Sequence, residues 1–209
     1  MGASGVQLVG IILAICGLIG AIVCCALPKW KETSFSGQNI VTAQTTWDGI
    51  WMTCVVQSTG QMQCKTHDSM LQLASDLQAA RALTVVSIVL AVFGVLVAFV
   101  GAEFTTCVEN ESTKSKISLT AGIVVAIAGL MLIIPVSWSA NTVIRNFYDP
   151  TTVSKMELGA SIFIGWASSV LLLIAGGLLC CFRPRGSGGS YSAQYYAKNA
   201  PSAPSKNYV

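Results

Sequence analysis

The stretch ALTVVSIVLAVFGVLVAFVGA, residues 82–102, contains no Asp, Glu, Lys or Arg and decides the class of the protein. Three other stretches share this property, over residues 1–28, 117–144 and 158–182. Each is longer than the roughly 18 apolar residues that indicate a membrane-spanning helix. We therefore expect an all-α transmembrane four-helix bundle, with spans at residues 7–27, 82–102, 117–138 and 158–182.

The composition excludes several classes of protein. Only 10% of the 209 residues are charged, whereas a soluble domain carries about 25%, so a soluble globular enzyme is not expected. The single histidine, His67, and nine scattered carboxylates provide little for acid–base catalysis. A net charge of +3 does not favour binding to nucleic acid. We expect no enzyme activity, no metal and no cofactor, and membrane lipid around the spans.

The orientation of the chain follows from its cysteines. Basic residues are divided equally between the two sides of the membrane, so the positive-inside rule does not decide. Cys54 and Cys64 lie in the long loop, where a disulfide requires an oxidising, extracellular compartment. Cys107, Cys180 and Cys181 lie near span ends, as expected for cytoplasmic S-palmitoylation. We therefore expect cytoplasmic segments at residues 1–6, 103–116 and 183–209, and extracellular loops at residues 28–81 and 139–157.

The third uncharged stretch is longer than a membrane requires. At about 1.5 Å per residue it reaches roughly 42 Å, whereas the hydrocarbon core is about 30 Å thick. We expect its outer end to project from the membrane to about residue 144, with a bend near Pro135. All four spans also contain small residues four positions apart, such as Gly122 and Ala126. Such pairs allow close helix packing, although they are common in any glycine-rich apolar helix.

The first outer loop predicts short antiparallel strands between Trp30 and Thr66, followed by a short amphipathic helix over residues 69–80. In the segment CVVQSTGQMQC, residues 54–64, a turn with a left-handed Gly60 pairs Cys54 with Cys64. Directly opposed residues are close enough for a disulfide, which contributes roughly 2–3 kcal/mol by closing this loop. Two unpaired thiols or a metal-binding pair are the alternatives.

The first outer loop contains a recognisable pattern of residues: Trp30, the Gly49-Ile50-Trp51 tripeptide, Cys54, Cys64 and Arg81. This pattern resembles the W…GLW…C…C signature of the claudins, with Ile50 where the family usually has Leu. The resemblance covers the whole chain. It implies a small, five-stranded, antiparallel extracellular sheet on the bundle. It also implies a tight-junction protein that polymerises with itself and other claudins, in one membrane and between cells, and thereby seals or selects the paracellular path.

The resemblance also assigns roles to residues of both outer loops. Trp30 and Trp51 are expected to anchor the sheet at the membrane surface, although ordinary aromatic belts are equally compatible. Four residues match positions for assembly, with a local loop core as the alternative for the aromatic pair: Phe147, Tyr148, Pro150 and Glu157. Some claudins carry Asn-Pro-Leu-Val-Ala here as a contact for clostridial enterotoxin. The corresponding segment 149–153, DPTTV, lacks the Leu, which disfavours toxin binding.

Lys65, directly after the second cysteine, resembles the family's pore-charge position. A positive charge about 6 Å from a passing cation, at an effective dielectric constant of about 40, costs the cation about 1.4 kcal/mol. That cost corresponds to roughly tenfold discrimination. We therefore expect a barrier to cations, with a solvated surface lysine as the alternative.

The tail is rich in Ser, Ala, Tyr and Pro, which is typical of disorder. It ends in Tyr208-Val209, and a free carboxylate after an apolar residue is the kind of end that PDZ domains bind. The resemblance implies a scaffold partner of the zonula occludens type. The main alternative is an auxiliary channel subunit or a myelin-type adhesion protein, which shares the tryptophan and cysteine pattern.

Overall fold

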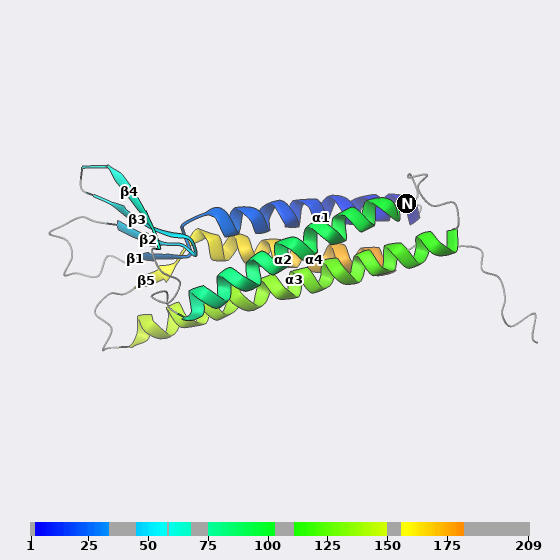
Figure 1. Cartoon of the computed structure of the whole chain (residues 1–209). Helices are drawn as coiled ribbons and strands as arrows, with labels where there is room; N and C mark the ends of the chain where they lie inside the picture. Colours follow the sequence, from blue (N-terminus) through cyan, green and yellow to red (C-terminus); the bar gives the residue numbers. More distant parts are fainter. Residues whose placement is uncertain are drawn as a thin grey trace, which may run out of the picture.

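Four helices run side by side and form an elongated bundle (Figure 1). The computed structural model describes residues 3–33, 45–57, 59–67, 75–102, 111–149 and 156–181. The helices are α1 (Ala3–Ala26), α2 (Ser75–Val100), α3 (Glu111–Tyr148) and α4 (Ala160–Cys181). Each contains a segment that is long and apolar enough to cross a membrane. The predicted four-span helical architecture is therefore confirmed.

The helix ends differ from those expected from the charge pattern. The helix α3 has 38 residues and runs without a break from Glu111, through Pro135, to Tyr148, so it is longer at both ends than the expected span. The helix α2 begins at Ser75, so residues 75–80 of the short helix expected to lead into the second span are continuous with that span. Residues 69–74 of that helix lie outside the described residues. The bend near Pro135 stays a prediction.

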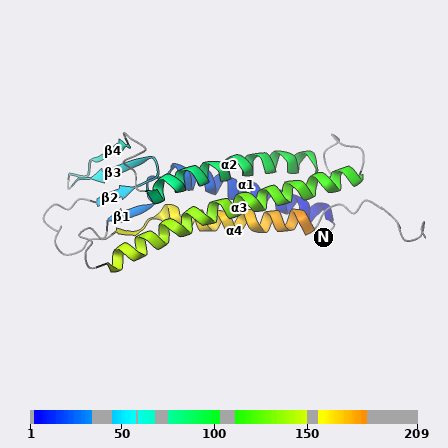
Figure 2. The same cartoon turned by 60° about the horizontal axis from the view of Figure 1, so that its bottom comes forward.

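A five-stranded antiparallel sheet stands at one end of the bundle, and the N-terminal end of α1 lies at the other (Figures 1 and 2). The strands are β1 (Lys31–Thr33), β2 (Thr45–Asp48), β3 (Met52–Val56), β4 (Met62–Thr66) and β5 (Met156–Leu158). Their order in the sheet is β4-β3-β2-β1-β5, so β5, from the second loop, completes a sheet that the first loop builds. The five strands expected from the claudin resemblance are present.

The hairpin of β3 and β4 has the predicted register. Cys54 lies opposite Cys64, and a disulfide joins them. Gly60 has a φ of 80°, the left-handed conformation that glycine adopts without steric cost. Its N–H donates to the Gln57 carbonyl over 2.9 Å, which closes the turn. Because Cys54 and Cys64 form a disulfide, the alternatives of two unpaired thiols or a metal-binding pair are excluded.

Small residues allow the helices to pack closely. A Cβ atom on Gly122 of α3 would lie 2.9 Å from the carbonyl oxygen of Gly176 on α4, and one on Gly17 of α1 would lie 2.9 Å from a side-chain carbon of Leu172. Apolar side chains such as Ile19 and Leu96 point outward from the bundle, where they are more than half exposed. This arrangement is expected of helices that pack through small residues and face lipid with large ones.

Candidate functional site: the sheet–bundle junction and the α3–β5 groove

Trp30 connects the start of the sheet to α1 through hydrogen bonds. Its side chain is fully buried, and its indole N–H donates to the carbonyl of Cys24 in α1 over 2.9 Å. Its backbone N–H donates to the Asp48 carbonyl of β2. A buried indole requires such a partner for its N–H. Trp30 therefore packs beneath the sheet as part of the core, whereas an aromatic-belt residue would be exposed to lipid.

The Gly49-Ile50-Trp51 segment forms the tight connection between β2 and β3. The Gly49 N–H donates to the Met52 carbonyl over 3.0 Å, and a Cβ atom at Gly49 would collide with the backbone of Pro28. Ile50 is fully buried, while Trp51 is 38% exposed. The Trp51 indole N–H lies 3.4 Å from the sulfur of Cys25 in α1. The connection thus packs directly on the end of the first helix.

Arg81 holds this connection from the second helix. Its guanidinium is almost fully buried and donates through Nε over 2.8 Å, and also through Nη2, to the carbonyl of Ile50. The same group lies 4.6 Å from the centre of the Trp51 ring, a distance suited to cation–π attraction. The signature residues that lie far apart in the sequence therefore meet in one junction between the sheet and the bundle.

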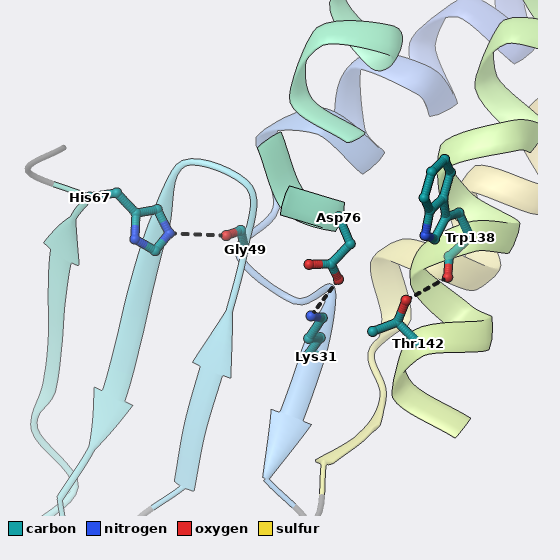
Figure 3. A network of polar contacts seen from close by, with 6 residues as sticks. All are labelled: Lys31, Gly49, His67, Asp76, Trp138 and Thr142. Atoms are coloured by element: carbon teal, nitrogen blue, oxygen red, sulfur yellow. Dashed lines mark hydrogen bonds and ion pairs between the residues drawn. The ribbon is translucent and has the colours of Figure 1, made fainter. Parts of the chain in front are cut away.

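A buried ion pair, which the sequence did not indicate, joins β1 to α2 at this junction. Lys31 Nζ on β1 lies 2.8 Å from Asp76 Oδ2 in the first turn of α2, and the two side chains are only 10% and 9% exposed (Figure 3). Nothing in the spacing of residues 45 positions apart predicts this pair. His67 also contacts the junction, because its Nε2 lies 3.3 Å from the Gly49 carbonyl (Figure 3).

A groove of about 330 Å³ lies between the sheet end of α3 and β5. Three of the four residues expected to take part in assembly line it, and Pro150 lies outside the described residues. Tyr148 is 79% exposed and packs edge-to-face on Phe147, with ring centres 5.7 Å apart. Most of the Tyr148 side chain is therefore uncovered, whereas Phe147 is half-buried. The lining residues are Val143, Ile144, Phe147, Tyr148, Met156, Glu157 and Leu158.

Lys65 lies on β4, the strand at the other edge of the sheet, and its side chain is exposed. It stands opposite Thr53 of β3. The groove and Lys65 therefore occupy opposite edges of one sheet, with the junction between them.

The cysteines expected to be acylated differ in exposure. Cys181, at the end of α4, is exposed, whereas Cys180 is half-buried with its sulfur 3.9 Å from the Leu119 carbonyl of α3. Cys107 and the terminal Tyr208 and Val209 lie outside the described residues.

Comparison with known proteins agrees with these features. The model of the PMP-22/EMP/MP20/Claudin family matches residues 4–179. Claudin-4 of Canis lupus familiaris is 57% identical and claudin-4 of Homo sapiens is 54% identical, each over the full length of both chains. Claudin-3 of Homo sapiens is 54% identical over 87% of this chain and 84% of its own. The chain therefore belongs to the PMP-22/EMP/MP20/Claudin family, and within that family to the claudins.

Proposed function

We propose that the protein polymerises within one membrane and between neighbouring cells, and that the polymer forms a paracellular barrier in which Lys65 opposes cations. Membership of the claudins gives the coarser part, a structural membrane protein of the tight junction that is not an enzyme. The orientation proposed for this role places the sheet outside the cell and both termini in the cytoplasm.

The groove between α3 and β5 is the observation that carries the proposal of assembly. It is lined mainly by apolar side chains, and Tyr148 at its edge is largely exposed. Burying about 100 Å² of such a ring against a neighbour contributes roughly 2.5 kcal/mol. A contact of this size is weak alone, but a polymer repeats it along its whole length, so an exposed aromatic groove favours assembly of copies.

Tyr148→Ala tests the assembly proposal in fibroblasts that lack tight junctions. Freeze-fracture images of cells with the wild-type protein should show intramembrane fibrils, and Tyr148→Ala should reduce them severalfold at equal surface expression. Asn146→Ala is the matched control, because Asn146 is exposed on the same turn of α3 but does not line the groove. Equal fibril density for both variants would contradict the role of the groove.

The position of Lys65 supports its proposed role in ion selectivity. Its side chain projects from an exposed edge strand, where a passing ion can approach it. The cost to a cation, about 1.4 kcal/mol at ~6 Å, corresponds to roughly tenfold discrimination before salt screening reduces it.

Two variants with the same change in net charge separate the position of Lys65 from bulk charge. Lys65→Gln and Thr66→Asp each lower the charge of β4 by about one unit at neutral pH, but neighbouring side chains in a strand point to opposite faces. Dilution potentials across an epithelial layer should show a several-fold rise in the cation-to-anion permeability ratio for Lys65→Gln and little change for Thr66→Asp. Lys65→Asp should show the largest rise. An unchanged ratio for Lys65→Asp would refute this role.

The last two residues of the chain support the proposal that the protein binds a scaffold partner in the cytoplasm. The terminal Tyr208-Val209 fits the strand-addition mode in which a PDZ domain binds a free carboxylate and an apolar last side chain. Deletion of Val209 from the full chain should abolish capture of a zonula occludens type scaffold while leaving delivery to the membrane unchanged. Undiminished capture would show that binding does not use the chain end.

The alternative of an auxiliary channel subunit or a myelin-type adhesion protein is compatible with the family model, whose name also covers PMP-22, EMP and MP20. The identities of 54–57% to claudins over the full chain favour the tight-junction role.

A further inference from the structure

We propose that Asp48 is a second selectivity-determining residue, an anion on the same sheet face as Lys65 that reduces the barrier to cations. This inference rests on the proposed role of Lys65 and extends it to a residue two strands away.

The strand register places the two charges in one row. Lys65 of β4 lies opposite Thr53 of β3, and Thr53 lies opposite Asp48 of β2. Directly opposed residues of antiparallel strands project from the same face. Lys65 and Asp48 therefore share a face, and with strands about 4.8 Å apart their Cα atoms are separated by about 10 Å. The disulfide row, one residue along, projects from the other face.

The next charge in the row is already neutralised. Lys31 of β1 lies opposite Asp48, but its ammonium forms the buried ion pair with Asp76 of α2 (Figure 3). Within the described ranges of the chain, no ion pair is formed by the Asp48 carboxylate, and its side chain is only partly buried. The pair Lys31–Asp76 thus contributes no net charge to this face, and the negative charge of Asp48 remains on it.

An ion moving along this face therefore passes a positive charge at the edge strand and a negative charge two strands inward. A cation beside Lys65 is about 10 Å from Asp48, a distance close to the Debye length in physiological salt. Asp48 therefore acts on that cation more weakly than Lys65 does, but its charge is not fully screened. Removing the Asp48 charge should strengthen the barrier and lower the cation-to-anion permeability ratio about twofold.

Dilution potentials of Asp48→Asn test this inference against a matched control. Glu32 of β1 belongs to the disulfide row, because it lies opposite Trp47, which lies opposite Cys54. Glu32→Gln therefore makes the same charge change on the other face. We expect a fall of about twofold in the permeability ratio for Asp48→Asn, the wild-type ratio for Asp48→Glu, and the wild-type ratio for Glu32→Gln.

The possible outcomes separate this inference from the proposed function. If Lys65→Gln changes the ratio but Asp48→Asn does not, the role of Asp48 is overturned and that of Lys65 stands. If Lys65→Gln has no effect, the proposed selectivity itself fails. Equal shifts for Asp48→Asn and Glu32→Gln would indicate an effect of net charge alone and would also overturn the inference. Asp48→Thr, a residue favourable in strands, provides the same test if Asp48→Asn does not reach the cell surface.

Discussion

Replacing Lys31 by Met should destabilise the folded protein substantially, because it leaves the Asp76 carboxylate buried without its partner. Removing one member of a buried ion pair costs about 3–5 kcal/mol, and both side chains here are about nine-tenths buried. Asp76 lies in the first turn of α2, where the helix dipole stabilises an anion by about 0.3–1 kcal/mol. We therefore expect a loss near the lower limit, about 3 kcal/mol.

Thermal unfolding of the purified protein in detergent measures this loss. For a chain of this length, 1 kcal/mol changes the melting temperature by about 2–4 °C, so Lys31→Met should lower it by about 10 °C. The double variant Lys31→Met/Asp76→Leu should recover most of this, because replacing both charges by apolar groups is often neutral. Lys29→Met is the control, since among the described residues the Lys29 ammonium makes a cation–π contact, 4.3 Å from the centre of the Trp47 ring, and losing it costs about 1 kcal/mol.

Two results would refute this reasoning about the junction. If Lys31→Met lowered the melting temperature no more than Lys29→Met, the ion pair would contribute little. If the double variant melted as low as Lys31→Met alone, the loss would come from packing of the Lys31 stem and not from the unpaired carboxylate.

Three further variants examine other contacts of the structure. Arg81→Lys keeps the charge but loses the paired N–H donors, so it should lower stability by about 1–2 kcal/mol in the same melting assay; an unchanged melting temperature would contradict the contact. Gly159→Ala places a Cβ atom against the backbone of the segment before β1 and should prevent surface delivery, whereas Gly177→Ala, with open space around it, should be delivered normally; equal delivery would argue against the close approach. Cys181→Ser should remove more thioester-linked acyl label than Cys180→Ser, because Cys181 is exposed whereas Cys180 is half-buried, and the reverse ranking in an acyl-exchange assay would exclude this assignment.

The features that could be predicted from sequence are those determined by the surrounding lipid or by a short stretch of the chain. Uncharged stretches identify membrane-spanning helices because lipid excludes charge. The hairpin register follows from Gly60 and the cysteine spacing, because a turn of fixed length determines every pair beyond it. The expected end of the third helix was too early because Arg145 interrupts the uncharged stretch, and a charge ends a membrane span without ending a helix.

The contacts of the junction could not be predicted in the same way. The pair of Lys31 and Asp76, and the carbonyl that Arg81 binds, depend on how the sheet is placed on the bundle. Neither contact has a sequence period or a fixed spacing. The claudin resemblance singled out Trp30 and Arg81, but only the structure identifies the carbonyl groups to which they donate hydrogen bonds. The groove required the structure too, because α3 and β5 each supply one side of it.

Two side chains that join the sheet to the bundle, those of Trp30 and Arg81, donate hydrogen bonds to main-chain oxygen atoms. The acceptors are the carbonyls of Cys24 and Ile50. A carbonyl is present whatever side chain its residue carries. The side chains at these two positions can therefore be exchanged for others of similar volume without breaking the hydrogen bonds that join the sheet to the bundle. The residues that donate, Trp30 and Arg81, have no such freedom.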